Sequence, residues 1–235
     1  MNTGIILQAR IGSSRLPGKV LKSIGRKLML EHIIYRLSFL QHSSQLILAT
    51  STLPGDDVLA YFCQSHSVNC FRGSELDVLD RYYRCAQQYK FDHVIRLTSD
   101  NPFVDIEELD RLIDLHYKSD ADYSHSFNAL PAGSGAVIFT FETLKQSYAD
   151  GIKPNHREHV NEYIQENPEL FHIETLQVIP SKNRKDIRLT VDTERDYQKA
   201  CFIVEHSKSD YITTEEAIDL CSIFEGFKQT GIVSN

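Results

Sequence analysis

Short apolar runs alternate with amphipathic stretches over the first hundred residues of the chain. Four runs rich in Ile, Leu and Val have the length of buried strands, and they cover residues 4–7, 46–50, 68–71 and 93–98. Three stretches between them place apolar side chains at helical spacing, at residues 28–40, 56–65 and 77–88. Strands and helices that alternate through short loops predict a largely parallel sheet with right-handed crossovers.

The order of the elements changes after Pro102. Helical spacing continues at residues 106–118, 155–166, 194–205 and 214–224. Further strands are expected at residues 122–126, 136–140, 171–179 and 187–191, with a loop at 127–134. No repeat, low-complexity tract or linker interrupts residues 1–235. We therefore expect one α/β domain with a mixed, mainly parallel sheet flanked by helices.

The composition is that of an ordinary globular protein, with 41% hydrophobic and 24% charged residues. No apolar run approaches the roughly 20 residues that a membrane span needs, and the first residues lack the basic segment of an export signal. We therefore expect a cytoplasmic protein without membrane insertion. The five cysteines have no CxxC spacing, which favours idle thiols in a reducing compartment over a metal or redox site.

A polar loop, QARIGSSRLPGK at residues 8–19, follows the first expected strand. Arg10, Arg15 and Lys19 bring cations to this loop, while its glycines and serines allow backbone N–H groups to approach a ligand closely. A polyphosphate needs this combination of N–H donors, planar guanidinium groups and an ammonium group. The alternative is a solvated turn without a ligand.

The charge distribution favours a ligand at this loop. Residues 1–30 contain six Lys and Arg residues and no acid, so against a net charge of −7 for the chain the remaining residues carry −13. A cationic segment in an otherwise acidic protein indicates a local anion site rather than a nucleic-acid surface. The loop matches neither GxxxxGK(S/T) nor GxGxxG, which argues against a P-loop NTPase and against a dinucleotide-binding site.

Two of the expected strands end in an aspartate. Asp100 follows residues 93–98 and Asp192 follows residues 187–191. Ligands of open α/β sheets bind at the carboxyl ends of the strands, so both carboxylates are well placed for a site. Asp100 is also compatible with a plain turn residue. Asp192 is also compatible with the cap of the following helix, as is Thr193 beside it.

The loop resembles the signature (P/Q)AR-x-GS-x-R-(L/F)-PGK of the cytidylyltransferases that activate acidic sugars, such as acylneuraminate and 3-deoxy-manno-octulosonate. Within this family the chain is most similar to the SpsF-like branch of spore-coat polysaccharide biosynthesis. The resemblance implies a nucleotide-diphospho-sugar transferase fold, which is GT-A-like and Rossmann-like, with CTP as a substrate and a homodimer as the assembly. We expect a nucleotide-binding half at about residues 1–105 and an acceptor-binding half at about residues 106–235.

The resemblance also implies roles for individual residues. The family's two strand-terminal aspartates, which hold Mg²⁺ on the nucleotide triphosphate, match Asp100 and Asp192, and Mg²⁺ suits oxygen ligands that are shared with phosphates. Two departures from the family's pattern, Ser99 for glycine and Glu194 for proline, remove no oxygen ligand. The three cations of the loop are then expected to neutralise the leaving pyrophosphate during catalysis. Further nucleotide contacts are expected from Gln8, Ala9, Gly12, Ser13, Ser14, Arg72, Ser74 and Ser99.

The expectation for Arg72 and Ser74 comes from the run FRGSELDVLDRYY at residues 71–83, which is similar to a run of SpsF-type sequences. On the helix within this run, Asp77 and Arg81 are four residues apart. Opposite charges at this spacing are common on helix surfaces, which favours a structural ion pair over a catalytic role.

Candidates for binding the acceptor come from the second half of the chain. They are His125, Asn128, Arg157, Glu158 and His159, the last three because they match the REHV segment of SpsF-like proteins. A zinc site at His156 and His159 is not favoured, because the spacing is not HExxH and supplies no third ligand. A purely structural role of these polar groups at a helix end stays open.

Three acidic positions of the run YPDGLDVEVF, which is common in SpsF-like chains, are Ala132, Gly135 and Val137 here. Loss of carboxylates beside an acceptor pocket would relieve repulsion of an anion, so we expect an anionic acceptor that carries a carboxylate or a phosphate. The alternative is a loop that tolerates substitution.

The resulting hypothesis is a Mg²⁺-dependent nucleotidyltransferase that transfers CMP from CTP to a small acidic sugar, for surface polysaccharide biosynthesis. The second hypothesis is a glycosyltransferase of the same fold, which would use a DxD metal motif; residues 120–122 have that spelling. The third is a non-catalytic nucleotide-binding homologue. We expect no nucleic-acid partner under any of the three.

Overall fold

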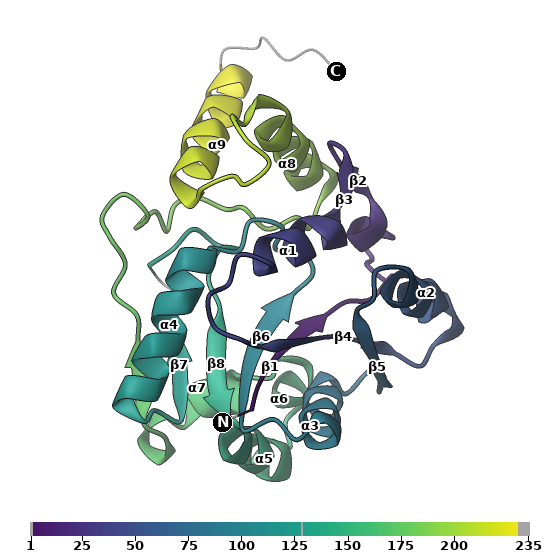
Figure 1. Cartoon of the computed structure of the whole chain (residues 1–235), viewed down its shortest axis with the longest axis vertical. Coiled ribbons are helices and arrows are strands. Elements are labelled where there is room, and N and C mark those ends of the chain that lie inside the picture. Colours follow the sequence, from purple (N-terminus) through teal and green to yellow (C-terminus); the bar gives the residue numbers. More distant parts are fainter. Residues whose placement is uncertain (1, 128, 230–235) are drawn as a thin grey trace.

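The strand–helix alternation of the first hundred residues forms one half of a seven-stranded sheet (Figure 1). The computed structural model describes residues 2–127 and 129–229. Four parallel strands pair in the order β5-β4-β1-β6, with the bounds β1 (Thr3–Gln8), β4 (Gln45–Ser51), β5 (Asn69–Gly73) and β6 (His93–Thr98). All four correspond to apolar runs in the sequence.

The second half of the chain completes the sheet in the order β8-β7-β9 beyond β6. These strands are β7 (Tyr123–His125), β8 (Val137–Thr140) and β9 (Ile173–Thr175). Strand β8 runs antiparallel to both β6 and β7, so the sheet is mixed and mainly parallel, as the sequence predicts. A separate hairpin pairs β2 (Ser23–Ile24) with β3 (Lys27–Leu28), next to the short 3₁₀ helix η1 (Lys19–Leu21).

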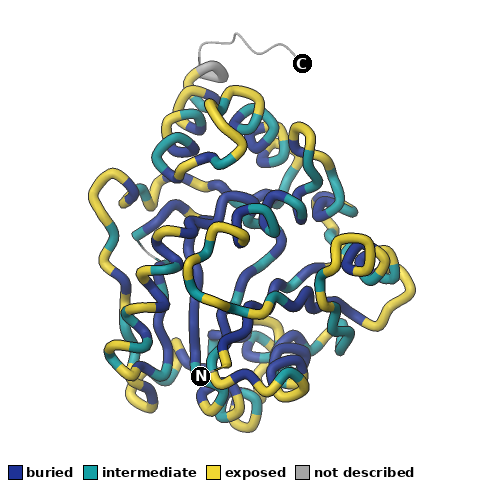
Figure 2. Tube along the Cα trace, in the orientation of Figure 1, coloured by how far each residue is buried: buried dark blue, intermediate teal, exposed yellow. Residues whose placement is uncertain are grey.

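Helices cover both faces of the sheet because side chains alternate between the faces along each strand. In β1, Ile5 and Leu7 point into one core and Ile6 into the other. The core of Ile5 and Leu7, called the first core below, includes side chains of α1 (Met29–Leu37), α2 (Asp57–Ser65), α4 (Ile106–Ser119), α8 (Glu194–His206) and α9 (Thr214–Gln229). The core of Ile6, called the second core, includes side chains of α3 (Val78–Tyr89), α5 (Phe141–Asp150) and α7 (Glu162–Glu166). Figure 2 shows the buried strands between these layers.

Four elements differ from the sequence-based expectation. The helix expected at residues 155–166 is two helices, α6 (Pro154–Glu158) and α7, because His159 is extended and Val160 turns into the second core. The strand expected at 187–191 is a single bridge between Arg188 and Ala132, and the strand expected at 171–179 shortens to β9. Helix α5 was not expected; it follows β8 directly, with Thr140 as its cap. Two further 3₁₀ helices, η2 (Pro54–Asp56) and η3 (Pro168–Leu170), precede α2 and β9.

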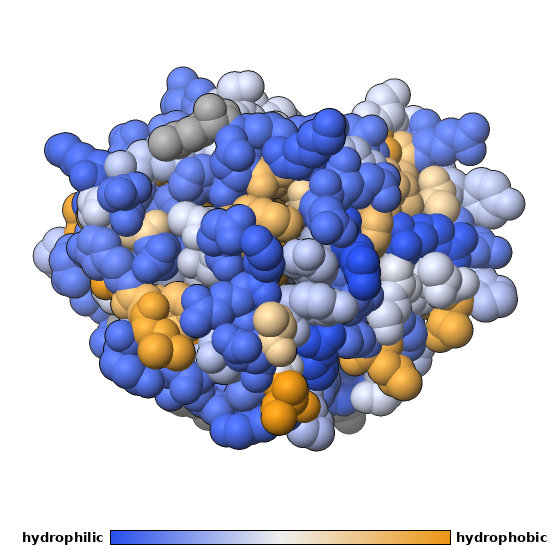
Figure 3. Space-filling model, turned by 90° about the horizontal axis from the view of Figure 1, so that it is seen from below, coloured by the Kyte–Doolittle hydropathy of each residue, from blue (hydrophilic) through white to orange (hydrophobic). Residues whose placement is uncertain are grey.

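No helix among the described residues combines the length and the apolar character needed to cross a bilayer. The face shown in Figure 3 is mainly hydrophilic, and its apolar side chains are scattered rather than gathered in one patch. The homodimer expected from the resemblance stays a prediction.

Candidate active site

A cleft of about 470 Å³ opens where β1 and β6 end, at the carboxyl edge of the parallel strands. Its volume lies in the range of pockets for small ligands. The lining comes from the loop after β1, the end of β6 and the turn after it, the segment before α3 with its first residue, the end of α6, and the segment before α8. The lining residues are Gln8, Ala9, Arg10, Ser13, Ser14, Arg15, Lys19, Val20, Glu75, Leu76, Val78, Arg96, Thr98, Ser99, Asp100, Glu158, His159 and Asp192.

The loop after β1, residues 9–18, is ordered by its own backbone and by one buried acid. Gly18 N–H donates to Ile11 O at 3.1 Å and closes the loop, with Gly18 in the left-handed conformation (φ 66°) that favours glycine. Asp56 at the end of η2 is 3% exposed and accepts a hydrogen bond from Ile11 N–H at 2.8 Å. Leu16 is buried in the first core. The loop is therefore a fixed structure rather than a solvated turn.

Asp56 was not identified from the sequence, although it supports the loop from a distance of 45 residues. Burial alone would raise the pKa of its carboxyl, but hydrogen bonds from Ile11 N–H and Ser51 outweigh burial and keep this pKa below its ordinary value. Asp56 is therefore a carboxylate at neutral pH. The sequence around Asp56 is that of an ordinary turn, so it does not predict a contact with the loop after β1.

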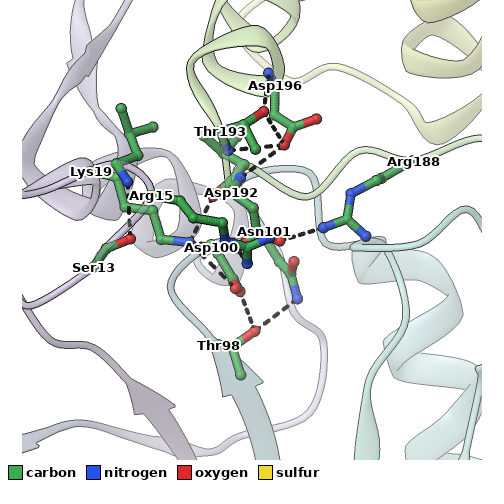
Figure 4. A network of polar contacts seen from close by, with 12 residues as sticks. Ser13, Arg15, Lys19, Thr98, Asp100, Asn101, Arg188, Asp192, Thr193 and Asp196 are labelled. Carbon is green, nitrogen blue, oxygen red and sulfur yellow. Dashed lines mark hydrogen bonds and ion pairs between the residues drawn. The ribbon is translucent and has the colours of Figure 1, made fainter.

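Lys19 lies between the carboxylates of Asp100 and Asp192 in the cleft (Figure 4). Its ammonium group lies 2.9 Å from Asp192 Oδ1 and 3.6 Å from Asp100 Oδ2, and it donates to Val191 O at 2.8 Å. Lys19 is only 9% exposed, so water screens these contacts weakly. A second backbone bond, from Val191 N–H to Asp100 O at 2.8 Å, holds the two segments together.

Asp192 is not the cap of α8, a role that the sequence left open for it. Thr193 is the cap of α8, since its hydroxyl accepts from Asp196 N–H, and Asp196 in return accepts from Thr193 N–H at 3.0 Å. The Asp192 carboxylate faces the cleft, where Arg15 lies 3.2 Å from Oδ1 and Arg188 pairs with Oδ2. Three cations therefore share this one acid in the structure (Figure 4).

Asp100 lies in the turn after β6 and keeps a partly exposed carboxylate. Thr98 at the end of β6 donates its hydroxyl to Asp100 Oδ1, and Asn101 in turn donates its side-chain amide to the Thr98 oxygen at 2.9 Å. The second oxygen, Oδ2, faces Lys19. Turn geometry and a ligand-facing carboxylate are therefore both present at Asp100.

The space between Asp100 and Asp192 suits a cation, because the Lys19 ammonium already occupies it. Among the residues that the structure describes, no three His, Cys, Asp or Glu side chains come close enough to hold a metal on their own. Two carboxylates fit a Mg²⁺ that takes its other ligands from phosphate and water, and they do not fit a closed zinc site.

Most residues that the sequence placed in the nucleotide site line the cleft. Gly12 does not, and the side chains of Arg72 and Ser74 are used elsewhere. Arg72 donates to Ser51 O and Leu53 O at 2.9 Å each, and its third nitrogen lies 2.6 Å from Asp57. Ser74 accepts from Asp77 N–H. These two residues brace the start of α2 and of α3.

The ion pair expected between Asp77 and Arg81 is wrong. The Asp77 carboxylate instead binds Arg157, which donates to it through Nε at 2.8 Å and Nη2 at 2.5 Å. Arg157 also donates to Tyr148 O at 2.9 Å and lies over the Tyr148 ring. Arg81 is fully buried, and among the described residues its side chain donates only to Glu75 O, at 3.4 Å. Asp77 prefers Arg157 because helix packing brings α6 against α3.

The other acceptor candidates divide into two groups. Glu158 and His159 are exposed on the wall of the cleft, whereas Arg157 and His125 do not line it. His125 contacts Thr175 at 3.2 Å, and burial lowers its pKa. Asn128 lies outside the described residues. His156 binds Glu166, which supports the structural alternative for this residue and ties α6 to α7.

The substitutions at Ala132, Gly135 and Val137 do not act on the cleft. Val137 is fully buried in β8, and a Cβ atom at Gly135 would lie 3.1 Å from Ser126 Oγ. Ala132 pairs with the segment before Asp192. The inference of relieved repulsion from these three positions is therefore wrong, because none of them lines the cleft.

Sequence analysis missed six lining residues: Val20, Glu75, Leu76, Val78, Arg96 and Thr98. Arg96 and Thr98 lie within the strand β6, where polar residues at alternate positions were the available signal. The stronger part of that signal is the cation Arg96, which lies between the buried apolar residues Ile95 and Leu97.

The sequence profile of the cytidylyltransferase family matches residues 4–230. The spore coat polysaccharide biosynthesis protein SpsF of Bacillus subtilis (strain 168) is 37% identical over 197 residues, which are 82% of this chain and 82% of that protein. The 3-deoxy-manno-octulosonate cytidylyltransferase of Solibacter usitatus (strain Ellin6076) is 28% identical over 111 residues, or 46% of this chain and 42% of that protein. A solved cytidylyltransferase from Leptospira borgpetersenii is 29% identical with a TM-score of 0.87, covering 100% of this chain and 98% of that one.

The matched profile spans nearly the whole chain, and it includes the loop after β1 and the two aspartates of the cleft, Asp100 and Asp192. With the SpsF similarity and the shared fold, this shows that the chain belongs to the cytidylyltransferase family.

Proposed function

We propose that this enzyme transfers CMP from CTP to a small anionic acceptor, depends on Mg²⁺, and releases pyrophosphate. The observation that carries the proposal is the convergence of the cationic loop, Asp100 and Asp192 on one cleft, with Lys19 in contact with both acids. The names of the SpsF and 3-deoxy-manno-octulosonate cytidylyltransferase relatives support CTP as the donor and surface polysaccharide biosynthesis as the process.

In the proposed reaction an acceptor oxygen bonds to the α-phosphorus of CTP as the bond from that phosphorus to pyrophosphate breaks. Arg10, Arg15 and Lys19 bind the triphosphate and neutralise charge on the leaving pyrophosphate. The backbone of the loop, held by Asp56, supplies fixed N–H groups and does not have to reorganise as charge builds up.

Asp100 and Asp192 would hold Mg²⁺, which when bound withdraws electron density from the phosphoryl oxygens. Lys19 would then move its contacts from these carboxylates to the phosphates. Arg188 would keep Asp192 in place, because it binds the oxygen that Lys19 does not use.

The glycosyltransferase alternative is weaker, because residues 120–122 do not form a metal motif. Asp120 ends α4 in a left-handed conformation, and Asp122 accepts a hydrogen bond from His172 N–H at 2.8 Å. Neither aspartate lines the cleft. Asp100 and Asp192 are both present and face the cleft, which argues against a non-catalytic homologue.

Pyrophosphate release tests the proposal directly. The enzyme is incubated with Mg²⁺, each of the four ribonucleoside triphosphates, and a panel of sugar acids, sugar phosphates and neutral sugars. We expect release with CTP and an anionic acceptor, and no release from the Asp100→Asn variant under the same conditions. Release of the free nucleotide from a nucleotide sugar, without pyrophosphate from any triphosphate, would support the glycosyltransferase instead. No pyrophosphate from any pair of triphosphate and acceptor would refute the proposal.

A further inference from the structure

A tight turn at residues 131–134 lies outside the cleft and contacts both segments that carry its aspartates. Ser134 N–H donates to Pro131 O at 3.0 Å and closes the turn, and Asp105 N–H donates to Ser134 O at 2.9 Å, which ties the turn to the start of α4. Gly133, the third residue of the turn, has a φ of 98°. A turn with a positive φ at its third residue favours glycine there. None of these four turn residues lines the cleft.

The turn is bonded to the segment that precedes Asp192. Ala132 N–H donates to Ile187 O at 2.9 Å, and Ala132 O accepts from Leu189 N–H at 2.7 Å. These two bonds form the single bridge that stands where the sequence predicts a strand. The turn therefore fixes the path of residues 187–191, which lead directly to Asp192.

The turn also meets the segment that carries Asp100. A Cβ atom on Gly133 would lie 3.1 Å from Asn101 Oδ1. Asn101 donates its amide to the Thr98 hydroxyl oxygen, and this hydroxyl donates to Asp100 Oδ1 (Figure 4). Crowding at Gly133 would therefore act on the residues that hold the Asp100 carboxylate.

The space at Gly133 is too small for any side chain. A Cβ atom there would lie 2.7 Å from Thr190 N and 2.8 Å from Thr190 Cγ2. Ordinary contact begins at 3.4 Å, so the turn and Thr190 would have to separate by about 0.7 Å. Thr190 stands two residues before Asp192, and Val191 N–H between them donates to Asp100 O. Groups that bind a metal have to be held to within about 0.5 Å, so this displacement is large enough to disturb them.

We propose that Gly133 is a positioning residue that sets the spacing between the Asp100 and Asp192 carboxylates. This inference rests on the proposed function, in which these two carboxylates hold a divalent cation. Mg²⁺ demands nearly ideal octahedral geometry, so a change in the spacing weakens its binding. The nucleotide is held by the loop after β1, which the turn at residues 131–134 does not form. Gly133 therefore acts on the cation and not on the nucleotide.

The test compares Gly133→Ala with a glycine variant that carries the same kind of strain elsewhere. Gly25 also has a positive φ, of 61°, and a Cβ atom there would lie 2.7 Å from Val204 Cγ1. Gly25 does not line the cleft, and Val204 lies near the end of α8 that is remote from Asp192. Gly25→Ala is therefore the matched control, and both variants should have a lower melting temperature than the wild type.

A third variant, Ala132→Pro, decides the matter if Gly133→Ala does not fold. Proline suits the second position of such a turn, and it lacks the N–H that donates to Ile187 O. Ala132→Pro therefore loosens the hold of the turn on residues 187–191 without crowding Thr190. Circular dichroism and melting temperature check the fold of every variant.

Electron paramagnetic resonance measures Mn²⁺ binding in the presence of a saturating CTP analogue that has a methylene bridge between the α- and β-phosphorus atoms. Calorimetry measures the affinity for the same analogue without metal. We expect Gly133→Ala to bind Mn²⁺ about 10- to 100-fold more weakly, the usual loss when an outer partner of a metal ligand is changed. Its affinity for the metal-free analogue should not change. Ala132→Pro should show a smaller loss in the same direction, and Gly25→Ala should match the wild type in both measurements.

Crystals grown without metal give a second measurement, the separation of the Asp100 and Asp192 carboxylates. We expect this separation to differ between Gly133→Ala and the wild type, and to be equal in Gly25→Ala and the wild type. An unchanged separation in Gly133→Ala would overturn the inference.

Three binding results would also overturn it: full Mn²⁺ affinity in Gly133→Ala, or in Ala132→Pro if only that variant folds; an equal loss of affinity for the metal-free analogue; or an equal loss of Mn²⁺ affinity in Gly25→Ala. If the wild type binds no Mn²⁺ beside the analogue, or releases no pyrophosphate from CTP with any acceptor, the proposed function fails. The carboxylate separation in the metal-free crystals then still decides the role of Gly133.

Discussion

Replacing Lys19 by methionine tests the central contact of the cleft. The substitution keeps the apolar stem and removes the ammonium group that faces Asp100 and Asp192. Hydrogen bonds to charged groups contribute about 1.5 to 3 kcal/mol, and removing one partner of a buried pair costs about 3 to 5 kcal/mol. Asp192 keeps Arg15 and Arg188 as partners, and the Asp100 side chain is 30% exposed, so the cost should be at the lower end.

We therefore expect Lys19→Met to lower the free energy of unfolding by about 2 kcal/mol, which for a chain of this size corresponds to roughly 4 to 8 °C in melting temperature. Affinity for CTP should fall by about 1.5 to 3 kcal/mol, because the triphosphate loses a charged donor. In the absence of nucleotide, the affinity for a divalent cation should instead be higher in Lys19→Met than in the wild type. The variant leaves two carboxylates without the ammonium between them, so Mn²⁺ no longer has to displace it.

The assay is thermal unfolding with and without Mn²⁺ and CTP, together with electron paramagnetic resonance to measure free Mn²⁺. Mn²⁺ alone should stabilise Lys19→Met more than the wild type. The control is Lys145→Met, since Lys145 lies exposed on α5, pairs with Glu142 and does not line the cleft. Equal Mn²⁺ affinity and equal melting temperature in Lys19→Met and the wild type would refute the argument that Lys19 occupies the cation position.

The remaining predictions concern the two carboxylates, a buried histidine and the arginine of α6. Asp100→Asn and Asp192→Asn should each abolish most pyrophosphate release with an unchanged circular dichroism spectrum, and the double variant should be little worse than either; full activity in a single variant would show that its charge is not needed. Burial lowers the pKa of His116 to about 3, so its contribution to stability is complete above 6.5 and is lost as the pH falls toward 3. The free energy of unfolding in urea should depend less on pH across this range in His116→Gln than in the wild type. An equal pH dependence in both would contradict the lowered pKa of His116. Arg157→Ala should lower the free energy of unfolding by about 2 to 3 kcal/mol without changing the KM for CTP, because Arg157 binds Asp77 outside the cleft; a variant as stable as the wild type would count against this role.

The positions of Asp100 and Asp192 in the cleft could be predicted from the sequence. Each aspartate follows an apolar run, and an apolar run that becomes a strand brings the residue after it to the edge of the sheet. For Asp100 this reasoning holds through β6. For Asp192 the expected strand is only a single bridge, yet the residue still reaches the cleft because Val191 N–H binds Asp100 O.

Charged partners show where local reasoning ends. The spacing of Asp77 and Arg81 predicts a pair on one helix, but Asp77 binds Arg157, which is 80 residues away. Asp56 binds the backbone of a loop 45 residues before it. Arg96 lies within the strand β6, where the sequence pattern predicts a buried strand and gives no role for this side chain. Periodicity reports which side of an element is apolar, and it does not report which polar groups meet across the fold.

The sequence by itself determined the four parallel strands, the helices between them, the cationic loop after the first strand, and the resemblance that identified the family. These features depend on neighbours along the chain, because side-chain alternation and helical spacing are local properties. Only the tertiary structure decided that Lys19 lies between Asp100 and Asp192, that Arg157 is held by Asp77, and that Arg96 lines the cleft. Each of these outcomes depends on distances between distant segments, which the packing of helices on the two faces of the sheet sets.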